Sequence, residues 1–185
     1  QARAEAGVRI RGIAGTSVGA LNGALMCMGD LQKALHIWEN MSYSRVMNVD
    51  DEKMHRFLNG KLSFREYTAE LLLRLGEGGI DVTPLRRLIE ENISEEAIRT
   101  SPVELYTTTY SVDDRKELVI DLKQVEEGQI IDYLLASAYI FPLFKSEKVQ
   151  GKTCIDAGAF NNVPVDALLE RGYKDIITIR IFGVG

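Results

Sequence analysis

Residues 8–28 combine a strand-like segment, a tight turn and a helix-like segment in immediate succession. Residues 8–14 alternate like a β-strand, residues 15–19 contain two glycines, and residues 20–28 form an apolar stretch with helical character. A strand that turns directly into a helix is the repeating unit of proteins in which helices cover a sheet. This unit therefore predicts an α/β fold.

The rest of the chain continues the alternation of helices and short apolar strands. Such strands are typical of a sheet that is covered on both faces. The predicted fold is a three-layer α/β/α domain with a mainly parallel sheet, in which residues 8–14, 153–155 and 176–182 are neighbours. We interpret residues 1–185 as a single domain. Further helices are predicted at 31–40, at 63–75 (opened by the capping box Ser63 to Glu66), at 129–138 and at 164–171, and another is predicted to be capped by Thr83 with Pro84 at its first position. Further strands are predicted at 103–110 and 117–122, and residues 41–51 are predicted to form a loop.

Composition excludes several classes of function. The chain of 185 residues has 22 basic and 27 acidic side chains, and the resulting net charge of −5 argues against a nucleic-acid partner. With Cys27, Cys154, His36 and His55 as its only cysteines and histidines, it has no plausible zinc cluster. Two lone cysteines also favour a reducing, cytoplasmic location. We expect no metal or cofactor, and no segment is apolar for long enough to cross a membrane.

The turn at residues 15–19 matches the pattern G-x-S-x-G. About 0.07 accidental matches are expected for this glycine and serine content. In a strand–turn–helix context, the two glycines, Gly15 and Gly19, permit close backbone passage and expose the hydroxyl of Ser17, while the amide of Val18 can stabilise an oxyanion. Alternatively, Gly15, Gly19 and Gly23 serve only to let the helix pack closely.

A nucleophilic serine needs a base. In α/β-hydrolases the order along the chain is serine, acid, histidine, and both His36 and His55 follow Ser17 too closely to fit it. A histidine beyond Gly185 remains an alternative. The other candidate is Asp156, which ends an apolar strand and precedes a loop of small residues, although an aspartate there can also be a simple cap.

Together the two segments resemble the patatin-like phospholipase family, over almost the whole chain from about residue 5 to residue 185. Residues 13–24 are similar to its serine motif, residues 156–164 to its D-G-G/A…N-x-P motif, and residues 134–138 to a further family segment. The resemblance implies a patatin-like fold and a Ser17–Asp156 dyad, with Gly158 in the aspartate loop. It also implies hydrolysis of the acyl esters of lipids.

Two departures from the family pattern qualify this expectation. Ala157 replaces the first glycine of the aspartate motif and would be strained if that position required a positive φ. The family's glycine-rich oxyanion loop would precede Gln1, which predicts a domain truncated at its N-terminus and leaves C-terminal truncation open. The rival hypothesis is a catalytically weak lipid-binding or scaffold protein that retains the fold.

The segment from Met41 to Phe57 is the predicted lipid contact. Met41, Met47 and Met54, with two aromatic residues, form an adaptable apolar set that would lie over the site and meet lipid. The alternative is a surface loop that packs on the core. The substrate of the protein would be a lipid or another ester, and its contact with a membrane would be peripheral.

Overall fold

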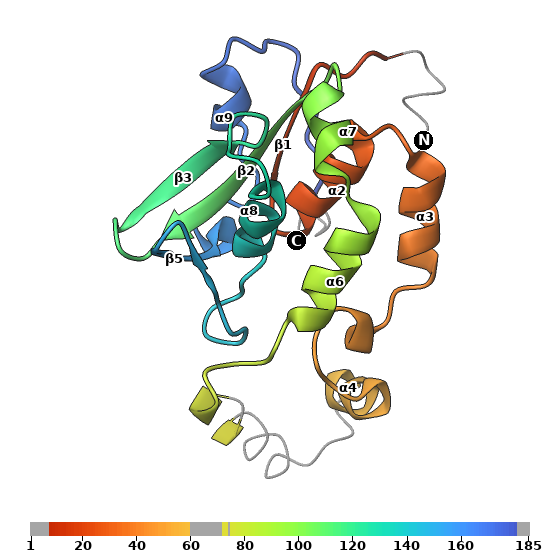
Figure 1. Cartoon of the computed structure of the whole chain (residues 1–185), viewed down its shortest axis with the longest axis vertical. Helices are drawn as coiled ribbons and strands as arrows, with labels where there is room; N and C mark the ends of the chain where they lie inside the picture. Colours follow the sequence, from red (N-terminus) through yellow and green to blue (C-terminus); the bar gives the residue numbers. More distant parts are fainter. Residues whose placement is uncertain (1–7, 60–71, 74, 181–185) are drawn as a thin grey trace.

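The computed structural model describes residues 8–59, 72–73 and 75–180, arranged as a mixed β-sheet with helices on both sides (Figure 1). The longest strand of the described part, β2, is central: β1 and β5 pair with one edge of it and β3 with the other, while β4 pairs with β5. The strands are β1 (Gly12–Thr16), β2 (Glu104–Ser111), β3 (Lys116–Asp121), β4 (Lys148–Val149) and β5 (Lys152–Asp156).

Two strands meet end to end along β2. β1 runs parallel to the first half of β2 and its last residue, Thr16, lies opposite Thr108. β5 runs antiparallel to the second half of β2 and its last residue, Asp156, lies opposite Thr109. Because consecutive residues of a strand are only about 3.3 Å apart along its axis, the C-terminal ends of β1 and β5 face each other.

The helices of the described part form two layers around this sheet. Side chains alternate between the faces of a strand, so Ile13 and Leu105, which approach Gly23 of α2, mark one face. Gly12 and Tyr106 mark the other face, where they meet Tyr173 and Arg171 just after α9. The helices are α2 (Val18–Cys27), α3 (Leu31–Glu39), α4 (Asp51–Leu58), α6 (Thr83–Asn92), α7 (Glu95–Thr100), α8 (Ile130–Ser137) and α9 (Asp166–Leu169), with short 3₁₀ turns η1 (Tyr43–Arg45) and η2 (Ala157–Ala159).

The core lies between the sheet and the layer that contains α2, α6 and α8. In α6 the buried residues Leu85, Leu88 and Ile89 recur at the spacing of one helical face. α8 is apolar on more than one side because it packs between β2 and α6, and Leu134 and Leu135 are both fully buried. α2 and α8 therefore fix the face of the sheet on which the ends of β1 and β5 open.

The α/β class and most of the predicted elements are confirmed, but the predicted parallel character of the sheet holds in part. Among the described strands, only the β1–β2 ladder is parallel; the ladders that join β3 and β5 to β2 and β4 to β5 are antiparallel. A tight turn at residues 112–115 forces β3 to run back along β2. The segment after α8 brings β5 in from the opposite direction to β1.

The first strand, the last helix and the last predicted strand differ most from the sequence prediction. The first strand spans residues 12–16 instead of 8–14, and the last helix spans residues 166–169 instead of 164–171. Residues 176–180 form no strand: Ile177 and Ile179 are exposed there, and without a paired neighbour their β-type pattern is not sufficient to form one. Residues 181–182 of that prediction lie outside the described residues, as does the capping box at 63–66.

Candidate active site

Ser17 sits in a sharp turn between β1 and α2. Its backbone has φ 55° and ψ −126°, a conformation that costs a non-glycine residue on the order of 1–3 kcal/mol. The first helical turn closes on the Ser17 carbonyl, which accepts hydrogen bonds from Ala20 N at 2.9 Å and Leu21 N at 3.3 Å. The N–H groups of Val18 and Gly19 thus belong to the open N-terminus of α2, where N–H groups lack intrahelical acceptors.

The two glycines of the turn have different steric roles. A Cβ at Gly15 would lie 2.4 Å from the carbonyl carbon and oxygen of Gly19. Strand and helix therefore approach so closely that only glycine fits at position 15. A Cβ at Gly19 would meet no atom of the described residues within 4 Å. Of the two glycines of this turn, only Gly15 is therefore required by packing.

Ser137, the last residue of α8, holds the backbone of the turn. Its Oγ accepts a hydrogen bond from Ser17 N at 2.8 Å and donates one to Thr108 O at 2.7 Å. The Ser137 side chain is fully buried. This hydroxyl ties the strained residue to the central strand, and strained conformations persist only where surrounding contacts fix them in this way.

Asp156 ends β5 and is tied to its own loop. Its Oδ1 accepts a hydrogen bond from Gly158 N at 2.7 Å, and its N–H donates to Tyr139 O at 2.9 Å. A Cβ at Gly158 would lie 3.0 Å from the same Oδ1, which favours glycine there. Ala157 is buried and is not among the described non-glycine residues with positive φ, so the strain considered for Ala157 does not arise.

Threonine and asparagine contacts join the serine turn to the aspartate loop. The Thr16 hydroxyl donates to Asn161 O at 2.9 Å and contacts the Thr108 hydroxyl. Asn161 Nδ2 in turn donates to Glu117 Oε1 of β3 at 2.9 Å, and Phe160 stacks on Tyr110 at 4.3 Å between ring centroids. The two motifs are thus parts of one hydrogen-bonded assembly, although among the described residues no hydrogen bond joins Ser17 Oγ to the Asp156 carboxylate.

An apolar cavity of about 280 Å³ opens beside Ser17. Side chains from α2, α3, α6 and residues 138–144 line it, and its polar lining residues in the described part of the chain are Ser17, Asn22 and Asn92. Both asparagines are engaged with the protein: Asn22 Oδ1 accepts from Trp38 Nε1 at 2.8 Å and Asn92 Nδ2 donates to Leu88 O at 2.8 Å. The cavity therefore suits an apolar occupant that reaches Ser17.

Part of the predicted lipid-contact segment reaches this cavity. Met41 and Met47 line it, together with Val46. Met54 on α4 is not among the lining residues, and the side chain of Phe57 lies outside the described residues. The core also supports these residues, because Met41, Val46 and Met47 are partly buried against it.

The histidines and cysteines do not line the cavity beside Ser17. His36 on α3 and His55 on α4 are exposed. Cys27 and Cys154 are buried, and burial raises the pKa of both thiols, which keeps them protonated. Among the described residues, no group of His, Cys, Asp and Glu side chains is arranged to hold a metal ion.

The sequence does not reveal the role of Ser137 or of two threonines in the middle of β2 that lie opposite the ends of β1 and β5. The signal for Ser137 is the single hydroxyl in the otherwise apolar run at residues 134–138, but its partner Ser17 is 120 residues away. Buried Thr108 and Thr109 read simply as strand formers in the sequence, and only the register reveals that they lie opposite the two motifs.

A model of the patatin-like phospholipase family matches residues 1–169. A comparison with curated proteins gives no match. No helix in the described ranges combines the length and apolar character that crossing a bilayer requires.

Proposed function

Because the chain belongs to the patatin-like phospholipase family, we propose that it hydrolyses lipid acyl esters with Ser17 as nucleophile and Asp156 as general base. Membership of the family supports a lipid acyl hydrolase function in general. The observation that carries the finer assignment is the end-to-end meeting of β1 and β5 along β2, because it brings the two motifs to one place in the sheet.

In the proposed reaction, Ser17 Oγ attacks the ester carbonyl carbon while the Asp156 carboxylate takes the hydroxyl proton. The protonated Asp156 gives that proton to the oxygen of the departing alcohol, which leaves an acyl group on Ser17. Water then repeats the sequence: Asp156 takes its proton, the water oxygen attacks the acyl carbonyl, and the proton returns to Ser17 Oγ as the fatty acid leaves.

The N-terminus of α2 supports the charge that develops during each attack. The Val18 N–H is the amide that follows the nucleophile, and it lies in the first turn of α2, where the helix dipole favours negative charge. Preorganised donors of this kind typically contribute about 10²–10³ in rate each. Because Asp156 Oδ1 accepts from Gly158 N, Oδ2 is the oxygen that would receive the Ser17 proton. Catalytic hydrogen bonds are commonly long in ligand-free sites.

A second candidate function is lipid binding with little catalysis. It is favoured by one specific observation: Asp156 Oδ1 is engaged by Gly158 N and not by Ser17 Oγ. In that case the cavity would bind acyl chains without turnover.

The test is turnover of medium-chain acyl esters by the chain and by four variants. Ser17→Ala and Asp156→Asn should each abolish turnover. The matched controls are Ser111→Ala and Asp121→Asn, which alter a serine and an aspartate at the ends of other strands, β2 and β3, and should keep most of it. Turnover that survives Ser17→Ala would refute Ser17 as the nucleophile, and absence of turnover together with fatty-acid binding would favour the second candidate.

A further inference from the structure

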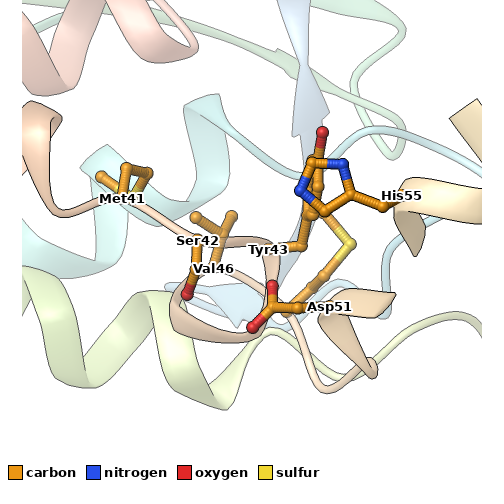
Figure 2. Close-up of a pocket in the computed structure, with 7 residues that line it drawn as sticks. Met41, Ser42, Tyr43, Val46, Asp51 and His55 are labelled. Atoms are coloured by element: carbon orange, nitrogen blue, oxygen red, sulfur yellow. The ribbon is translucent and has the colours of Figure 1, made fainter. Parts of the chain in front are cut away.

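A second, more open pocket of about 590 Å³ lies next to the cavity at Ser17. Residues that follow α3, residues in and after η1, and residues on α4 line it. Figure 2 shows Met41 and Val46 on one side of this outer pocket and His55 on the other. The His55 ring meets the edge of Tyr43 at 5.4 Å between ring centroids.

The inner cavity and the outer pocket share a wall. Met41, Val46 and Met47 line both of them. These three residues, which we call the methionine wall, separate the space beside Ser17 from the outer pocket. All three are partly buried.

The backbone of the methionine wall is anchored while its methionine side chains are adaptable. Asn48 N donates to Asp81 O at 2.8 Å, and Arg45 Nη1 donates to Asn40 O at 3.1 Å. Asp51 accepts hydrogen bonds from Ser44 N at 3.0 Å and from Ser44 Oγ at 2.5 Å. Methionine has three rotatable bonds and a polarisable thioether, so its side chain can yield where the backbone does not.

We propose that the methionine wall sets the acyl-chain length that the site accepts, with Met47 as a specificity-determining residue. The proposal rests on the proposed function in placing the ester at Ser17 and the acyl chain in the inner cavity. Chains that fit within the inner cavity bind without disturbing the wall. Longer chains must displace Met47 to continue into the outer pocket.

The volume of the inner cavity gives the length at which the wall is reached. An apolar cavity of about 150 Å³ holds a six-carbon ring, so a cavity of about 280 Å³ takes on the order of ten carbons. Met47→Ala removes three heavy atoms from the wall. The accepted chain should therefore lengthen by about three carbons.

The experiment measures dissociation constants for saturated fatty acids of eight to sixteen carbons, below their micelle concentrations, by calorimetry. All these fatty acids carry the same carboxylate, so each difference in affinity between neighbouring chain lengths reports the added methylenes. Affinity should rise about fourfold with each added methylene, which corresponds to about 0.8 kcal/mol. This rise should continue to a length on the order of ten carbons and then level off. In Met47→Ala the rise should continue for about three more carbons.

The control variant is Met28→Ala, because Met28 is also partly buried against the core but lines neither cavity. In this control, the break in the profile of affinity against chain length, where affinity stops rising, should come at the same length as in the unaltered chain. A break that does not move in Met47→Ala, a similar shift in Met28→Ala, or affinity that does not depend on length would overturn the proposal. Fatty-acid binding needs no catalysis, so a shifted break without Ser17-dependent turnover would contradict the proposed hydrolysis but not the methionine wall.

Discussion

Ser137→Ala should lower the rate of catalysis by far more than its loss of folding stability alone would explain. The substitution removes the hydroxyl that accepts from Ser17 N and donates to Thr108 O, at a fully buried position. Leaving buried polar groups unpaired costs about 1–3 kcal/mol, and we expect a loss near 2 kcal/mol. For a chain of this length that loss lowers the Tm by about 4–8 °C.

The effect on turnover follows from the geometry of the turn. Without the Ser137 hydroxyl, the strained backbone at Ser17 loses its link to β2 and can relax away from φ 55°. Displacing a reacting group by about 1 Å can cost about 10² in rate. We therefore expect kcat for a medium-chain ester to fall about 10–100-fold, with KM changed little.

Ser111→Ala is the matched control for Ser137→Ala. Ser111 is equally buried, and its Oγ accepts from Asp114 N at 3.1 Å and donates to Asp114 Oδ2 at 3.0 Å, at the far end of β2. Urea unfolding should show similar stability losses in both variants, while kcat should stay within about twofold in Ser111→Ala. If both variants lose stability and turnover in the same proportion, Ser137 does not position Ser17.

Three further predictions concern the turn and the core. Gly15→Ala should lower the free energy of unfolding by about 1–3 kcal/mol because its Cβ would clash with the Gly19 backbone, whereas Gly19→Ala should leave it unchanged or raise it by up to about 1 kcal/mol; equal urea-unfolding losses would contradict this. Ser17→Gly should be more stable than Ser17→Ala by about 1 kcal/mol, because glycine relieves the strain at φ 55°; thermal unfolding checks the order of the two variants. Burial, reinforced by Glu147, raises the pKa of Tyr139 from its usual 10 to about 12, so the folded state loses stability as pH rises from about 10 towards 12. Between pH 8 and pH 11, the free energy of unfolding measured with urea should fall by about 1.4 kcal/mol less in Tyr139→Phe than in the unaltered chain.

The sequence predicts the serine turn and the aspartate loop well because both signals are local. Gly15, Ser17 and Asp156 are marked by residue type and by their place at the end of an apolar strand. The helices at 20–28, 31–40 and 129–138 are also predicted from local signals: residues 31–40 by apolar residues that recur at helical spacing, and the other two by mainly apolar stretches.

The direction of β5 and the contacts of Ser137 are not local, and the sequence does not predict them. The direction of β5 depends on how the chain returns after α8, which no spacing within residues 153–155 encodes. The Ser137 hydroxyl finds its partners in β2 and at the Ser17 turn only after α8 packs against the sheet. The φ of Ala157 is likewise set by the turn η2, so residue type alone suggested a strain that does not occur.

The activation of Ser17 by Asp156 is tested most directly by the rate at which a fluorophosphonate modifies the protein. Mass spectrometry of the labelled peptides locates the modified residue and gives its rate in the unaltered chain, in Asp156→Asn and in the control Asp121→Asn. We predict modification at Ser17, a rate reduced by at least about 10²-fold in Asp156→Asn, and an unchanged rate in Asp121→Asn. Modification of another residue, or equal rates at Ser17 in the unaltered chain and in Asp156→Asn, would contradict this prediction.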